Sequence, residues 1–256
     1  MRKGKIDMKK FKEFLFVIAI LAIAGALVHF IYTNTSTRPS RELAKRMAEL
    51  SPRGGPPETI DGLRQAIALY EDQIERHVRE AAQTGVYFKI LATRLADRGL
   101  HNDALAALER AIYYNTEDAA IYYMTGVSAG HVGKSIVGFS PNAERERELY
   151  FNLAENSYLR ALEIDITYTR PMYGLAVLYV FELDRPQDAI VQLERYLQIQ
   201  VSDINAMFLL ARAYFMTREL SRAGDIYLRI ADRTKNKEIR EQALELRDQI
   251  QGMIYD

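Results

Sequence analysis

Apolar side chains between residues 85 and 235 recur at intervals of three and four around two series of small residues. The first series is Ala92, Gly126, Ala176 and Ala211, and the second is Ala104, Ala154, Ala189 and Ala223. The steps are 34, 50 and 35 residues in the first series and 50, 35 and 34 in the second. Intervals of three and four put side chains on one face of a helix, where a small residue lets a second helix approach closely. The pattern predicts four helix–turn–helix units of about 34 residues, one of which carries an insertion.

Large residues stand at fixed places beside the small ones. In the first half of each unit an aromatic residue or Met precedes the small residue by four, as at Phe88, Tyr122, Met172 and Met207. In the second half a large residue follows the small one by four, as at Leu108, Tyr158, Leu193 and Tyr227. This arrangement resembles the tetratricopeptide repeat (TPR), whose consensus has the form W-x2-L-G-x2-Y…A-x3-F…P. The proline that closes each consensus repeat is absent, and its places are taken by Thr116, Ile166, Val201 and Lys235.

The resemblance covers residues 85–235 and implies an all-α, TPR-like α-solenoid of helix–turn–helix repeats. Residues 58–84 are amphipathic and are expected to form a separate leading helix or half-repeat, and residues 236–256 a C-terminal capping helix. The insertion lies near 134–149, where Ser140-Pro141 predicts the start of a helix. The loop before it carries three apolar residues that either contact another molecule or pack against the repeats: Ile136, Val137 and Phe139.

Residues 14–32 are predicted to form a transmembrane helix. They carry no formal charge, and as a helix they extend roughly 28 Å, close to the hydrocarbon thickness of a bilayer. All six Lys and Arg residues of the first 32 lie before this segment. The positive-inside rule then places residues 1–13 in the cytoplasm and the rest of the chain across the membrane, in the periplasm if the source is bacterial. A cleaved signal peptide is the alternative, because Ala24-Gly25-Ala26 resembles a cleavage site. Residues 33–57 are interpreted as a polar tether; the alternative is that residues 40–50 form a short helix, capped by Ser40, that makes a dimer contact.

Charge and cysteine content narrow the function further. The 256-residue chain has 34 basic and 34 acidic residues. Residues 1–32 hold six of the basic and two of the acidic ones, so the remainder has a formal charge of 28 − 32 = −4. A mildly acidic body argues against nucleic acid as the partner. The absence of cysteine excludes disulfides, cysteine metal ligands and cysteine nucleophiles.

The segment that most resembles a catalytic or cofactor motif is Ser128–Ser135, which nearly matches the phosphate-binding loop G-x4-G-K-[ST]. Ser128 replaces the first glycine, and a repeat helix stands where the motif needs a strand. The histidines His29, His77, His101 and His131 form no metal-binding spacing. We therefore expect no enzyme activity, no cofactor and no metal; a nucleotide-dependent enzyme that uses Lys134 is the least favoured hypothesis.

The resemblance implies a protein-binding groove lined by the first helix of each repeat. Carried onto this chain, the groove positions are Lys89, Thr93, Tyr123, Val127, His131, Tyr173, Val177, Phe181, Phe208, Arg212 and Phe215. Such a groove is mainly aromatic and aliphatic, and an amphipathic helix or an extended apolar peptide fits it.

The predicted function is that of a membrane-anchored scaffold or adaptor that binds a protein partner through this groove, in assembly or quality control of a cell-envelope complex. One alternative is a structural subunit of a membrane-associated machine, in which a second copy or a fixed partner fills the groove. Another is a secreted soluble repeat protein, which follows if the N-terminal segment is cleaved.

Overall fold

The computed structural model describes residues 42–51, 55–138 and 141–255, and within these ranges all regular structure is helical. The chain divides into two compact units, residues up to Val78 and residues from Arg79 onward. A short helix covers residues 42–50. It is followed by α2 (Ile60–Ala96), α3 (His101–Tyr114), α4 (Ala119–Ser135), α5 (Pro141–Ile164), α6 (Thr169–Phe181), α7 (Pro186–Ile199), α8 (Ile204–Met216), α9 (Leu220–Arg233) and α10 (Lys237–Tyr255).

The predicted transmembrane segment, residues 14–32, lies outside the described ranges. Within them, no helix combines the length and the apolar character that crossing a membrane requires.

The expectation of a separate leading helix over 58–84 was wrong, because α2 runs without a break from Ile60 to Ala96. Its start is capped by Thr59, whose Oγ1 accepts a hydrogen bond from the Gly62 amide at 3.0 Å. Gly85 is the one strong helix breaker near the expected end. A Cβ at Gly85 would lie 2.5 Å from the Asn115 side chain, so this glycine permits a close approach and does not end the helix.

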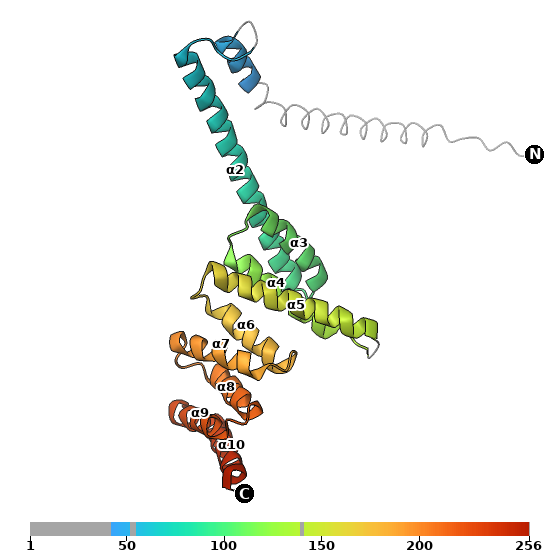
Figure 1. Cartoon of the computed structure of the whole chain (residues 1–256), viewed down its shortest axis with the longest axis vertical. Coiled ribbons are helices and arrows are strands. Elements are labelled where there is room, and N and C mark those ends of the chain that lie inside the picture. The colour runs from blue at the N-terminus through green and yellow to red at the C-terminus, as the bar shows by residue number, and fades with distance from the viewer. Residues whose placement is uncertain (1–41, 52–54, 139–140, 256) are drawn as a thin grey trace, which may run out of the picture. The chain divides into compact units, whose positions relative to one another are not determined.

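In the second unit the helices pack as successive antiparallel hairpins (Figure 1). The two series of small residues lie at the helix contacts, and all seven alanines among them are fully buried. Besides its chain neighbours, α6 contacts both α4 and α8. These three helices therefore form one continuous inner face, and the predicted all-α repeat fold is confirmed.

The insertion lengthens one hairpin. Helix α4 has 17 residues and α5 has 24, against 13 in α6 and 14 in α7. Helix α5 begins at Pro141, as the sequence indicated. The added turns pack tightly, since a Cβ on Gly133 would lie 2.6 Å from the Phe151 ring. In the connecting loop Ile136 is half-buried and Val137 is 92% exposed, whereas Phe139 lies outside the described residues.

Changes in repeat length fall inside the repeats and not between them. From the second small residue of one repeat to the first of the next the distance is always 22 residues: Ala104 to Gly126, Ala154 to Ala176, and Ala189 to Ala211. Within a repeat the distance is 12, 28, 13 and 12 residues in turn. The extra residue of the third repeat lies in the turn between α6 and α7. The connection that stacks one hairpin on the next is therefore constant.

The turns inside the first, third and fourth repeats share a left-handed residue. These are Gly99 with φ 75°, Asp184 with φ 49° and Arg218 with φ 64°. In each turn the amide that follows this residue bonds back to a carbonyl in the last part of the preceding helix, for example Glu219 N to Tyr214 O at 2.9 Å. Glycine adopts this conformation freely, and Asp tolerates it better than Arg does.

Replacing Arg218 by glycine should therefore stabilise the protein. The left-handed conformation costs a residue with a Cβ about 1 kcal/mol, which the substitution removes, although a more flexible unfolded chain offsets part of the gain. We expect a rise of a few degrees in the melting temperature, measured by circular dichroism. Gly224→Ala is the control that makes the reverse substitution, from glycine to a residue with a Cβ. It should also raise the melting temperature, because α9 is helical there and the new Cβ meets no atom within 4 Å. A fall in melting temperature for Arg218→Gly would mean that the arginine side chain has a stabilising role.

Candidate functional site

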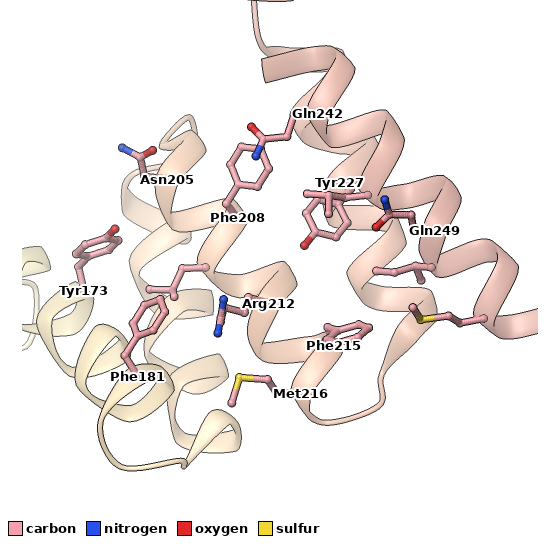
Figure 2. A pocket seen from close by; sticks show the side chains of 14 residues that line it. Tyr173, Phe181, Asn205, Phe208, Arg212, Phe215, Met216, Tyr227, Gln242 and Gln249 are labelled. Carbon is pink, nitrogen blue, oxygen red and sulfur yellow. The ribbon is translucent and has the colours of Figure 1, made fainter. Parts of the chain in front are cut away.

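A hollow of about 740 Å³ lies on the inner face of the second unit, between α6, α8, α9 and α10. Five of the predicted groove residues line it: Tyr173, Phe181, Phe208, Arg212 and Phe215. The opposite wall comes from the end of the chain, with Tyr227 on α9 and Gln242, Leu246, Gln249, Ile250 and Met253 on α10 (Figure 2). We call this hollow the C-terminal pocket.

Aromatic surface dominates the C-terminal pocket and remains open to solvent. Phe181 is 52% exposed and Phe215 is 41% exposed, whereas Phe208 is half-buried and its ring lies 6.0 Å from that of Tyr227. Burial raises the pKa of Tyr227, and the nearby Arg212 charge opposes this shift. The phenol therefore stays protonated and can donate a hydrogen bond into the hollow.

Arg212 is the one charged residue among those that line this pocket. Its guanidinium lies 4.9 Å from the centre of the Phe181 ring, which is a cation–π contact. Within the described ranges Arg212 forms no ion pair. The amides of Gln242 and Gln249 face the aromatic residues from α10 (Figure 2). The pocket is thus an apolar cleft with a single positive charge and a few hydrogen-bonding groups, the usual character of a ligand-binding hollow.

A second hollow of about 200 Å³ lies further along the same face, between α4, α5 and α6. It contains the predicted residues Tyr123, Val127, His131, Tyr173 and Val177. Tyr173 lines both hollows. The two therefore adjoin at this ring, and one extended groove follows α4, α6 and α8. Its N-terminal part is more polar, because Arg170, Lys134 and Glu182 also line it.

His131, at the edge of the second hollow, stacks on His101 of α3. The ring centres are 4.2 Å apart and the planes are nearly parallel. Burial lowers the pKa of His131, and the neighbouring His101 and Lys134 lower it further. Lys134 itself lies 3.8 Å from Glu182. Lys134 and Glu182 largely offset each other, so Arg170 leaves this end of the groove with a net positive charge.

The two remaining predicted groove residues line neither hollow. The Lys89 ammonium lies 2.6 Å from the Asp118 carboxylate, and both side chains are about 30% exposed or less. Asp118 also caps α4, because its other oxygen accepts a hydrogen bond from the Ala120 amide. Thr93 donates its hydroxyl proton to the Lys89 carbonyl oxygen at 3.0 Å. The Lys89 ion pair thus joins α2 to the start of α4 in the next repeat, and the Thr93 hydroxyl bonds within α2.

The segment resembling a phosphate-binding loop lies wholly within α4, and Ser128 is buried. Its backbone amides are used by the helix and do not converge on a cavity. Within the described ranges, no group of three or more His, Asp or Glu residues is placed to hold a metal ion.

The contribution of α9 and α10 to the C-terminal pocket was missed at the level of sequence. The sequence predicts a cap over residues 236–256 because Ile239, Ala243, Leu246, Ile250 and Met253 have helical spacing. A cap that only covers the last repeat buries its apolar face. Here Ile250 is buried, but Met253 remains 56% exposed and faces the hollow. Gln242 and Gln249, seven residues apart, were the available signal, since they put amides on the face beside that apolar stripe.

Comparison with known proteins finds similar chains and similar folds among helical-repeat proteins. No protein-family model matches the chain. A protein of Borreliella burgdorferi described as a TPR repeat-containing protein is 20% identical over 213 residues, which are 83% of this chain and 90% of that relative. A MamA structure from Desulfovibrio magneticus has a TM-score of 0.51 at 14% identity and covers 67% of this chain and 96% of its own. A thermophilic TPR protein of Thermus thermophilus has a TM-score of 0.50 at 17% identity, over 82% of this chain and 97% of its own.

The stacked hairpins and the open inner face define an α-solenoid built from helical repeats. The comparisons agree with the resemblance seen in the sequence: the chain has the fold of tetratricopeptide-repeat proteins and is similar in sequence to one protein described as such.

Proposed function

We propose that the chain is a non-catalytic adaptor that binds a segment of a partner protein in the groove along α4, α6 and α8. The observation that carries the proposal is the C-terminal pocket, where exposed aromatic rings from α6 and α8 surround the charge of Arg212. Exposed apolar surface in a preformed cleft is the usual mark of a protein-binding site.

The chemistry of the pocket suggests which segment fits. Aromatic walls favour one or two large apolar side chains from an amphipathic helix or an extended peptide. Arg212 lies beside them with the guanidinium stacked on Phe181, so an acidic group on the same segment gains a charge-assisted hydrogen bond. The preferred ligand is therefore an apolar segment that carries a carboxylate.

The cellular setting of this adaptor follows from the N-terminal sequence. An uncharged stretch over 14–32 that follows six Lys and Arg residues supports a single membrane anchor, with the repeats on the far side of the membrane. A groove held at the membrane suits assembly or quality control of a cell-envelope complex.

Site-specific photocrosslinking in cells tests this function. A photoreactive amino acid at Phe181 should capture a defined partner, whereas the same residue at Val191 should not. The two positions are matched in exposure, at 52% and 53%, but Val191 lies on α7, outside both hollows. The captured protein should be recovered from the membrane fraction.

Two further variants test whether the groove is responsible for capture of the partner. The double variant Phe181→Ala/Phe215→Ala removes exposed rings, so the melting temperature should change little while capture falls at least about tenfold, as expected for interface aromatic residues worth 1–2 kcal/mol. Arg212→Glu should reduce capture similarly by repelling the carboxylate. Equal capture from Phe181 and Val191, or full capture by the Phe181→Ala/Phe215→Ala variant with the photoreactive residue at Asn205, which also lines the pocket, would rule out the groove as the binding site.

A further inference from the structure

The first part of α2 carries a row of exposed apolar side chains. Ile60, Leu63, Ile67, Tyr70, Ile74 and Val78 follow one another at steps of three and four residues, and each is between 42% and 69% exposed. Such steps place all six along one side of the helix. Over 19 residues they form a strip roughly 28 Å long, nearly three heptads. We call it the α2 strip.

The short helix 42–50 packs beside a different side of α2. Between the two helices lies a hollow lined by Arg46, Glu49 and Leu50 and by Gln65, Ala68 and Leu69 of α2. On the same side Gly62 and Ala66 are buried. None of these residues belongs to the α2 strip. An exposed strip of this length on a soluble surface is the mark of an interface with another molecule.

The positions of the strip match those of a two-stranded coiled coil. Ile60, Ile67 and Ile74 take the a positions of a heptad, and Leu63 and Tyr70 take the d positions. Apolar residues at a and d positions allow two helices to pack against each other along such a strip. We propose that the α2 strip binds the same strip of a second copy of the chain, with the two helices antiparallel.

The side chains along the strip favour the antiparallel arrangement over the parallel one. When the pair is centred between Ile67 and Tyr70, Leu63 faces Ile74 of the second copy, and Tyr70 faces its Ile67. A parallel pair would instead set Tyr70 against Tyr70 and His77 against His77, so two of its layers would each hold a pair of rings.

The charged residues beside the strip also favour the antiparallel arrangement. Arg64 and Glu71 occupy the e positions, which face each other across an antiparallel pair. The pair therefore gains two Arg64–Glu71 contacts by symmetry. Arg64 is available for them, since its contact with Asp61 at 3.3 Å is exposed and weak. In the parallel arrangement Glu71 would face Ala66, and no attraction would result.

Cysteine crosslinking in the full-length chain tests the proposal. The protein has no cysteine, so introduced thiols are the only ones. Leu63→Cys and Ile74→Cys variants, mixed in membranes and oxidised, should form a disulfide-linked dimer. Each variant alone should not, because like positions then lie 11 residues apart along the pair, roughly 16 Å, beyond the reach of a disulfide. Asp72→Cys, on the outer side of the same helix, should not form a disulfide-linked dimer in any mixture.

A second substitution tests the cause of the crosslink. Ile67→Glu changes a residue that is 55% exposed, so the helical signal should persist while the yield of Leu63–Ile74 dimer falls at least about tenfold. Crosslinking of Leu63→Cys with itself would show a parallel pair and overturn the proposed arrangement. Absence of dimer in the mixture, or an unchanged yield with Ile67→Glu, would exclude pairing through the α2 strip. None of these outcomes bears on capture at Phe181, so this test is independent of the test of the adaptor proposal.

Discussion

Raising the pH from about 9 to about 11 is expected to unfold the repeat unit cooperatively, because buried phenols cannot ionise in the folded chain. Burial raises the pKa of Tyr158, Tyr179 and Tyr214. In the last two a hydrogen bond to a glutamate adds to the effect, from Tyr179 to Glu155 at 2.9 Å and from Tyr214 to Glu194 at 2.6 Å. Burial, with a hydrogen bond to Asp203, raises the pKa of Tyr196 to about 12.

The direction of this effect follows from proton binding. Above the ordinary pKa of about 10 the unfolded chain loses phenolic protons that the folded chain keeps, so the free energy of unfolding falls as the pH rises. One fully buried phenol contributes at most about 1.4 kcal/mol per pH unit. Several such residues together therefore remove a large share of a typical stability of about 5–15 kcal/mol.

Tyrosinate absorbance followed together with far-ultraviolet circular dichroism measures the transition. The chain has 16 tyrosines and no tryptophan, so the absorbance signal is free of interference. The early part of the absorbance change should occur without loss of helix. A second group should ionise only as the helical signal disappears. If all tyrosines titrated near pH 10 with the helices intact, the inner phenols would have to be accessible to solvent.

Gly126→Ala is expected to destabilise the protein by about 1–2 kcal/mol even though alanine is the better helix former. A Cβ at Gly126 would lie 2.6 Å from the Tyr158 ring. The ring cannot retreat, since it also lies 2.8 Å from the Cβ position of Gly174 on α6. Tyr158 thus fills a slot between two glycines of neighbouring repeats.

Gly130→Ala is the matched control on the same helix. Nothing lies within 4 Å of its Cβ, so the substitution should stabilise the protein by up to about 1 kcal/mol. Chemical denaturation of both variants gives the comparison. Equal stability changes of the same sign would mean that the slot for Tyr158 is loose and that α4 and α6 can separate.

The repeat fold was predictable because its signal is local and occurs four times. A small residue at Gly126 or Ala176 is required by helix contacts that the same side-chain spacing reproduces in each unit, so a single chain holds four examples of the rule. The length of α2 was not predictable by this means. Gly85 reads as a helix breaker in sequence, and only the nearness of Asn115 explains why it is tolerated.

Only the wall of the candidate groove that the first helices of the repeats form was predictable from the sequence. Positions in the first helices follow from the repeat register, and nine of the eleven line the two hollows. Contacts between distant parts of the chain have no register to reveal them. The ion pair of Lys89 with Asp118 and the stacking of His101 on His131 join residues about 30 positions apart. The α10 wall belongs to the last helix, which has no repeat of its own to compare with.

The constant 22-residue link between hairpins has a consequence for how this chain tolerates change. Because both departures from the 34-residue unit fall inside a repeat, one in the lengthened ends of α4 and α5 and one in the turn between α6 and α7, insertions and deletions are confined to one edge of the stack. Loops along that edge can grow or shrink without altering how any hairpin meets the next, and the binding face keeps its shape while the edge diversifies.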